Sequence, residues 1–314
     1  MRRKSSFLKK LQKKPKIFLL LIVILVSSVA FFSNEIAIFE PLSNFKDKVD
    51  LYSSTKNIEN IENIENIEIG HDTDTYNIPN DINLPDNFQT AKRLAKIIHQ
   101  DNPKTFYCGC KYDKHNKIHL DSCGYLVKRD KRRASRLEWE HIVPVSLWGK
   151  NFPCWREKLC CDKKSCYKGR RCCEKIDLKF AKMESDLHNL VPEIGELNGL
   201  RSNYRFGLLP QIPAGQLGAC EFKIDSETRR VEPPKEVRGV IARTYLYMSD
   251  TYHIPLSKSQ WQLFTAWNRQ YPPEQKEIEW DEKVAYYQGN HNLYISDYEA
   301  FKQSTQKLHN MEKR

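Results

Sequence analysis

The segment Glu138-Trp139-Glu140-His141-Ile142-Val143-Pro144 places two carboxylates and an imidazole side by side in a run that ends at a proline. A second polar segment spans residues 186–203 and contains Asn198 and Arg201. Together the two segments supply a neutral base, hard oxygen ligands for a cation, and an arginine. A metal-assisted phosphodiester hydrolase needs all of these groups, and few other chemistries do.

Each residue type has a defined use in such a reaction. A histidine with an ordinary pKa near 6.5 is largely neutral at pH 7 and can accept a proton from water. A hard divalent cation takes carboxylate and amide oxygens, and an arginine can hold a phosphate with two parallel hydrogen bonds. The complete set is His141 as base, Glu140 and Asn198 as ligands, and one of Arg170, Arg171 or Arg201 on the phosphate. The alternative is an exposed Glu-His pair and a simple turn at Asn198-Gly199.

The N-terminus predicts export. Residues 1–16 hold eight Lys or Arg and no acid, and an apolar run follows from Ile17 to Val26, extending weakly to Phe32. We interpret residues 1–32 as a signal peptide, with 28–30 as its cleavage site, or as an uncleaved signal anchor. An anchor of sixteen residues reaches only about 24 Å, short of the ~30 Å hydrocarbon core. In both cases the rest lies outside the cytoplasm, either secreted or periplasmic, or held at a membrane facing outward.

The charge separates two further regions. Residues 33–87 contain four Asn-Ile-Glu repeats at 57–68 and predict a low-complexity acidic linker. Residues 17–90 carry twelve acids and three bases, whereas residues 91–314 carry a net charge of +12. We therefore expect a basic domain at 88–314 that suits a polyanion, most simply DNA, with RNA as a second substrate.

The ten cysteines predict disulfides, because the number is even and the compartment is oxidising. A zinc site at 154–173 is the rival interpretation, but the spacing lacks paired C-x2-C knuckles. The candidates are Cys108, Cys110, Cys123, Cys154, Cys160, Cys161, Cys166, Cys172, Cys173 and Cys220.

The periodicity predicts one helix-rich α+β domain. A helix is expected from Phe88, with Asp86 as its N-cap. Other helices are expected at 182–190 and 193–197, broken near Pro192, and at 237–252 and 257–270, the last with a core-facing aromatic stripe. Short strands are expected at 105–108, 125–127 and 136–143.

Several blocks resemble the bacterial endonuclease I family of periplasmic and secreted nonspecific nucleases. They include WEHIVP at 139–144, KMESDLHNLVP at 182–192 and GELNG at 195–199, and the resemblance runs in order over about residues 90–295. It implies a ββα-metal (His-Me finger) core that presents the base and the cation, and an endonuclease whose products carry 5′-phosphates.

The resemblance also implies individual roles. His141 becomes the general base. Glu140 and Asn198 become Mg²⁺ ligands, with other hard divalent cations as substitutes. Gly169-Arg170-Arg171-Cys172 matches the block that carries the phosphate-binding arginine, which favours Arg170, with Arg171 second. Glu184 becomes a partner of His141.

Two departures from the family and two alternatives remain. Residues 155–168 are longer and richer in cysteine than in the shortest members, and residues 277–281 lack a cysteine that members often have there. One alternative is a surface protein that captures DNA without cutting it, and the other is a metallohydrolase of small phosphodiesters. We expect a monomer, with membrane association only if the leader stays uncleaved.

Overall fold

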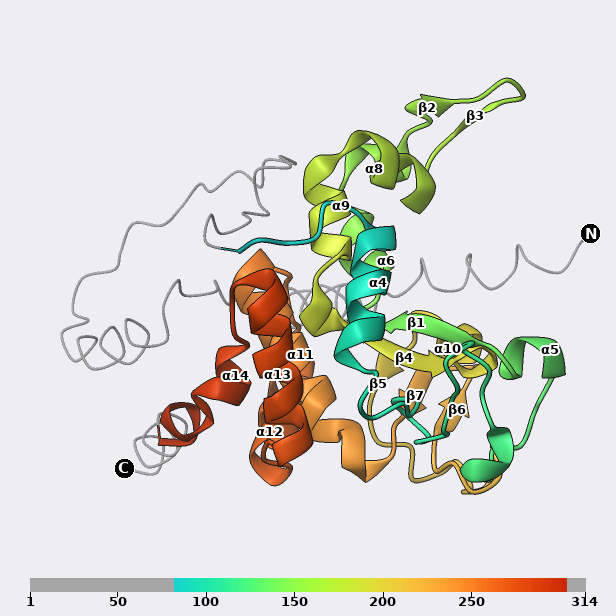
Figure 1. Ribbon diagram of the computed structural model, residues 1–314, viewed down its shortest axis with the longest axis vertical. Helices are drawn as coiled ribbons and strands as arrows, with labels where there is room; N and C mark the ends of the chain where they lie inside the picture. The colour runs from blue at the N-terminus through green and yellow to red at the C-terminus, as the bar shows by residue number, and fades with distance from the viewer. Residues whose placement is uncertain (1–81, 304–314) are drawn as a thin grey trace, which may run out of the picture. The chain divides into compact units, whose positions relative to one another are not determined.

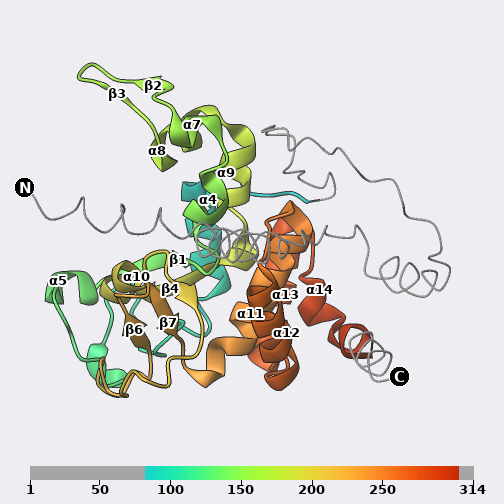
Figure 2. The same cartoon turned by 180° about the vertical axis from the view of Figure 1, so that it is seen from behind.

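The computed structural model describes residues 82–303 (Figures 1 and 2). The predicted leader, and the predicted linker as far as residue 81, lie outside these residues. Within residues 82–303 no helix is long and apolar enough to cross a bilayer. The helices are α4 Phe88–Ile98, α5 Lys131–Ala134, α6 Val145–Gly149, α7 Pro153–Arg156, α8 Arg170–Ile176, α9 Leu178–Glu184, α10 Gly195–Arg201, α11 Lys235–Tyr252, α12 Lys258–Gln270, α13 Gln275–Gln288 and α14 Leu293–Ser296, with 3-10 turns η3 Leu120–Ser122 and η4 Leu187–Asn189. The strands are β1 Leu137–His141, β2 Cys160–Cys161, β3 Cys166–Tyr167, β4 Leu190–Ile194, β5 Arg205–Phe206, β6 Lys223–Asp225 and β7 Arg230–Glu232.

Two antiparallel strands and one helix form the centre of the fold. β1 pairs with β4, so that Glu140 lies opposite Val191 and His141 opposite Leu190. β4 runs directly into α10, which packs on both strands. A side chain at Gly195, the first residue of α10, would meet the Arg133 carbonyl oxygen at 2.7 Å, so this close packing requires glycine. The predicted α+β class, with a ββα centre, is confirmed.

A group of helices lies beside this centre and contacts it through α4 and η4 (Figure 1, orange to red). α11 is the main core helix and buries Ile241, Leu246 and Met248 among others. It packs along α12, whose start is fixed by a capping box between Ser257 and Gln260. The helices predicted at 237–252 and 257–270 are therefore confirmed.

The structure corrects several predicted elements. Residues 190–194 form strand β4, where the sequence predicted helix interrupted at Pro192. Residues 105–108 form a turn that the Gly109 N–H closes onto the Thr105 carbonyl, and Tyr125 makes only an isolated bridge to Gly218. Asn87, and not Asp86, caps α4, because its side chain accepts the Thr90 N–H at 3.0 Å.

All ten cysteines form disulfides, which confirms their predicted oxidation and leaves no thiolate for the rival zinc site. Two bonds hold the segment before β1, and three lie within residues 154–173. The pairs are Cys108–Cys220, Cys110–Cys123, Cys154–Cys173, Cys160–Cys172 and Cys161–Cys166.

Candidate active site

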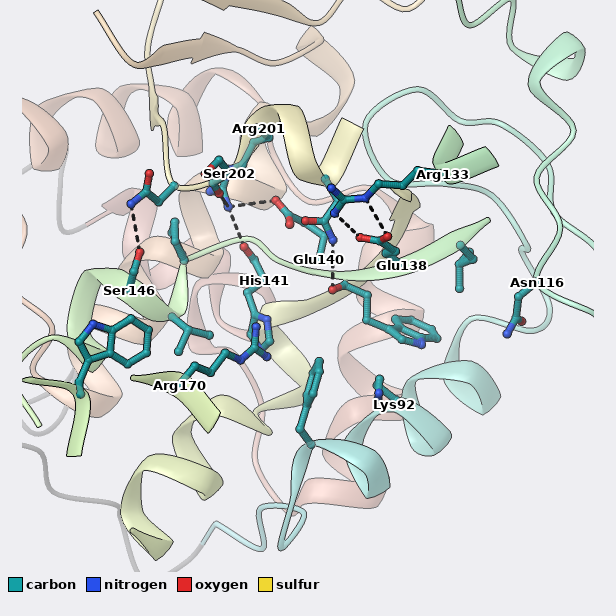
Figure 3. Close-up of a pocket in the computed structure, with 18 residues that line it drawn as sticks. Lys92, Asn116, Arg133, Glu138, Glu140, His141, Ser146, Arg170, Arg201 and Ser202 are labelled. Carbon is teal, nitrogen blue, oxygen red and sulfur yellow. Dashed lines mark hydrogen bonds and ion pairs between the residues drawn. The ribbon is translucent and has the colours of Figure 1, made fainter. Parts of the chain in front are cut away.

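A pocket of about 810 Å³ opens along β1 (Figure 3). Its walls come from β1 itself, from α4, from the start of α8 and from α10. Beyond Leu137, β1 pairs only with β4 within the described chain, so its other edge faces the pocket. Successive side chains of β1 point to opposite faces of the strand. At this free edge both faces border the pocket, so side chains from both can reach it. Glu140 lies on the side of α10, and His141 on the side of α4, against the Phe88 ring.

His141 is held in one tautomer. Its side chain is buried (6% exposed), and Nε2 lies 2.8 Å from the backbone carbonyl oxygen of Glu184. A carbonyl only accepts hydrogen bonds, so Nε2 carries the proton and Nδ1 keeps its lone pair. Burial lowers the pKa of His141 to about 3, and the Arg170 charge acts in the same direction. The imidazole is therefore neutral at pH 7.

Arg170 is the first residue of α8 and reaches into the pocket beside His141 (Figure 3). Its Nε donates to the carboxylates of Glu174 and Glu184, and its guanidinium lies 4.9 Å from the centre of the Phe88 ring. Its Nη2 is buried and has no hydrogen-bond partner in the part of the chain that the structure describes. The hydrogen bonds of Nε thus fix the guanidinium, and Nη2 remains as a donor for a ligand.

Glu184 links the two preceding residues. Its backbone carbonyl accepts from His141, while its fully buried carboxylate pairs with Arg170. The sequence predicted a contact between Glu184 and His141, and the contact exists, but through the main chain. The side chain instead fixes the arginine.

Glu140 is almost fully buried (3% exposed) and has one oxygen engaged. Its Oε1 accepts from the Tyr107 hydroxyl at 3.0 Å and lies 2.9 Å from Nη1 of Arg201. No residue in 82–303 donates a hydrogen bond to Oε2. Burial raises the pKa of Glu140, although Arg201 and Tyr107 act against this. A further positive charge at Oε2 would favour the ionised carboxylate.

Arg201 is occupied within the protein. It is 1% exposed, and its guanidinium donates to the carbonyl oxygens of His141 and Ile142 as well as pairing with Glu140. It therefore fixes the end of β1 and the rotamer of Glu140. Arg171, the other candidate, is exposed, lies over the Tyr167 ring and does not line the pocket.

Asn198 supplies the second oxygen on the α10 side. Its Nδ2 donates to the Trp139 carbonyl at 3.4 Å, which assigns the amide orientation, and Oδ1 has no partner among residues 82–303. Those residues contain no cluster of three or more His, Cys, Asp or Glu suited to a metal. The donor set is thus one carboxylate oxygen and one amide oxygen. It fits a cation such as Mg²⁺, which keeps several waters and takes few protein ligands.

The fold therefore brings His141, Glu140, Asn198, Arg170 and Arg201 to one pocket and leaves Arg171 outside it. Sequence reasoning missed Tyr107, which positions Glu140, and the ring of Phe88, which contacts both His141 and Arg170. No local motif marks either residue. Tyr107 lies in a turn, and Phe88 read only as a core position of its helix.

The block that carries Asn198 also fixes a basic segment. The Glu196 carboxylate accepts the backbone N–H groups of Lys128, Arg129 and Asp130 at 3.2, 2.5 and 2.7 Å, and the Tyr125 hydroxyl at 3.0 Å. These contacts hold residues 128–133, here named the basic loop, against α10. The loop contains five Lys or Arg and one Asp, and its Arg133 lines the pocket.

Replacing Glu196 by glutamine should weaken the fold in a pH-dependent way. Burial favours a higher pKa, but the three N–H groups outweigh it and lower the pKa of Glu196 below its ordinary value of 4.5. Its stabilisation is therefore present above about pH 4.5 and is lost as the pH falls through the lower folded pKa. At pH 7 we expect Glu196→Gln to lower Tm by roughly 2–8 °C. Thermal unfolding between pH 7 and 3 should show this gap closing.

The exposed Glu227→Gln serves as the control. It should leave Tm close to that of the unmodified protein at pH 7. A gap for Glu196→Gln that stays constant down to pH 3 would show that the ionised carboxylate does not hold the basic loop.

Comparison with known proteins places the chain among nucleases. The family model described as Endonuclease I matches residues 43–299. Endonuclease-1 of Buchnera aphidicola subsp. Baizongia pistaciae (strain Bp) is 43% identical over 213 residues, which are 67% of this chain and 82% of that protein. An extracellular deoxyribonuclease of Aeromonas hydrophila is 43% identical over 212 residues, 66% of this chain and 88% of that protein. A periplasmic deoxyribonuclease of the same species is 42% identical over 212 residues, covering 66% and 84%.

Proposed function

Because the chain belongs to the endonuclease I family, we propose that it is an exported endonuclease that hydrolyses the phosphodiester bonds of DNA with little sequence preference. The observation that carries this proposal is one pocket with four groups free to act. They are Nδ1 of His141, Nη2 of Arg170, Oε2 of Glu140 and Oδ1 of Asn198. The relatives are named extracellular and periplasmic deoxyribonucleases, which supports a secreted or periplasmic location and DNA as substrate.

His141 acts as the general base. Nδ1 takes a proton from a water molecule that attacks the phosphorus atom, while the Glu184 carbonyl keeps the proton on Nε2 and fixes the ring plane. The same carbonyl oxygen also stabilises the imidazolium that forms, because it accepts the hydrogen bond from the positively charged ring. The buried environment ensures that the histidine is unprotonated when the substrate arrives.

Arg170 binds the phosphate. Its Nη2 donates to a non-bridging oxygen of the scissile phosphate, and the positive charge offsets the charge that grows there. Glu184 and the Phe88 ring keep the guanidinium in place before the substrate binds. Arg171 and Arg201 have no such role, since Arg171 lies outside the pocket and both terminal nitrogens of Arg201 bind Glu140 and main-chain carbonyls.

Glu140 and Asn198 would hold Mg²⁺ through Oε2 and Oδ1. When bound, the cation supplies charge neutralisation at the phosphate and at the leaving oxygen. Arg201 and Tyr107 prepare the ligand by holding the other carboxylate oxygen. Other hard divalent cations can take the same ligands.

The 3′ oxygen of the scissile phosphodiester leaves, so the products carry 5′-phosphates. RNA is a second substrate, and the working form is a monomer.

Cleavage of supercoiled plasmid by the oxidised protein should require a divalent cation. We expect nicking and then degradation with Mg²⁺, no cleavage with EDTA, and full recovery of cleavage when excess Mg²⁺ is restored. The reason is that Glu140 and Asn198 without the cation cannot offset the negative charge that grows on the phosphate and the leaving oxygen. End-labelling of the products reports on the 5′-phosphate. Plasmid that is bound but stays intact with Mg²⁺ would establish the DNA-capture alternative instead.

A further inference from the structure

The hairpin β2–β3 is a cationic projection between α7 and α8, each of which contributes one residue to the pocket. Residues 158–168, here named the basic arm, contain Lys158, Lys163, Lys164 and Lys168 and one acid, Asp162. All four lysines are exposed, and none forms an ion pair with a described residue. Figures 1 and 2 show the hairpin projecting from the base of α8. By contrast, Lys276, Lys283 and Lys302 on the helical side pair with carboxylates.

The arm is rigid by construction. Cys161–Cys166 closes the hairpin near its tip, Cys160–Cys172 fastens its base to α8, and Cys154–Cys173 joins the preceding helix α7 to α8. Asp162 closes the turn by accepting the backbone N–H groups of Lys164 and Ser165 at 2.9 and 3.0 Å. The acid is thereby engaged with the main chain, and the lysines stand out from a fixed backbone. A preorganised cationic surface loses little conformational entropy when it binds a polyanion.

The arm and the basic loop each adjoin residues that line the pocket. Arg170 and Trp155, which flank the arm in sequence, and Arg133 of the basic loop all line it, and Arg133 and Arg170 lie on opposite sides of Glu140 and His141 (Figure 3). In Figures 1 and 2, α5 and the hairpin lie on the same side of α4. A pocket of about 810 Å³ holds a short stretch of a nucleic acid, so a polymer bound there extends beyond it.

Building on the proposed function, we infer that the basic arm binds the phosphate backbone of duplex DNA outside the catalytic pocket. The basic loop does the same on the other side, and the pocket lies between the two contacts. Neither element carries the chemistry. They raise the affinity for polymeric substrate and hold it in register with His141 and Arg170. Lysine contacts to phosphate do not depend on base sequence, which agrees with cleavage of little sequence preference.

The test compares Lys163→Ser/Lys164→Ser with the control Lys235→Ser/Lys258→Ser. The control removes the same charge from exposed residues in the first turns of α11 and α12. Binding of a labelled 30-base-pair duplex is measured in EDTA over a range of salt concentrations. Each lost phosphate contact should lower the slope of log affinity against log salt by about 0.9. We therefore expect the arm variant to lose about 1.8 in slope, which is about 60-fold less of the gain in affinity between 1 M and 0.1 M salt.

The control should keep the slope of the unmodified protein. Hydrolysis of bis(4-nitrophenyl) phosphate with Mg²⁺ should be the same for all three proteins, because this small diester reaches only the pocket. Equal slopes in the arm variant and the unmodified protein, or equal losses in arm and control variants, would refute the role of the arm. If the unmodified protein leaves plasmid intact with Mg²⁺, the proposed function itself fails, whatever the slopes are.

Discussion

His141→Ala is expected to lower the rate of DNA cleavage by about 10²–10⁴-fold, the contribution of a positioned general base. The loss follows from the geometry, since Nδ1 of His141 is the proposed proton acceptor next to Arg170 and no other histidine lines the pocket within residues 82–303. The measurement is single-turnover cleavage of a labelled duplex with enzyme in excess, so that binding does not limit the rate. Affinity for the duplex in EDTA should change little.

Two further variants make this result specific. The exposed His115→Ala should cleave at the unmodified rate. His141→Gln keeps a donor for the Glu184 carbonyl but has no proton acceptor of comparable basicity, so it should fold well and be as slow as alanine. Cleavage by His141→Gln within a few-fold of the unmodified protein would mean that another group takes the proton.

Arg170→Ala should lower the single-turnover rate by about 10²–10³-fold, as when a donor to developing charge is removed. The variant is expected to fold, because burial raises the pKa of Glu184. That carboxyl can therefore take up a proton once its partner is gone. The neighbouring Arg171→Ala is the matched control, with the same chemical change one residue along α8.

The control should stay within about twofold, since the Arg171 guanidinium lies over Tyr167 and away from the pocket. The pair tests the preference for Arg170 over Arg171 that the family resemblance gave. A larger loss for Arg171→Ala than for Arg170→Ala would reverse the assignment, and equal losses would show that both act only through net charge.

The sequence predicted the parts of the fold that are governed by local rules. α11 and α12 were evident because their apolar residues recur with helical period. β4 was missed for a physical reason. All five of its residues are buried, so it shows no alternation, and it contains Pro192. Its partner β1 lies some fifty positions earlier, so the pairing that makes it a strand is a long-range event.

The site was predictable as a set of residue types but not as an arrangement. The blocks around His141 and Asn198 named the base and the ligands, and the structure places them in one pocket. Which arginine joins them depends on the direction of successive side chains on α8, which only the packed helix defines. The contact of Glu184 with His141 runs through a carbonyl, and side-chain identity carries no information about main-chain contacts.

The tip of the basic arm has a consequence for survival among proteases outside the cell. Lys163 and Lys164 are exposed on a turn, where trypsin-like enzymes cut most readily. Both lie between Cys161 and Cys166, which are joined to each other. A cut after either lysine therefore opens the chain without releasing a fragment, and the two new ends stay tied at the hairpin. A digested molecule keeps its arm and all its residues, gains only the mass of one water, and separates into pieces only when a reductant is added.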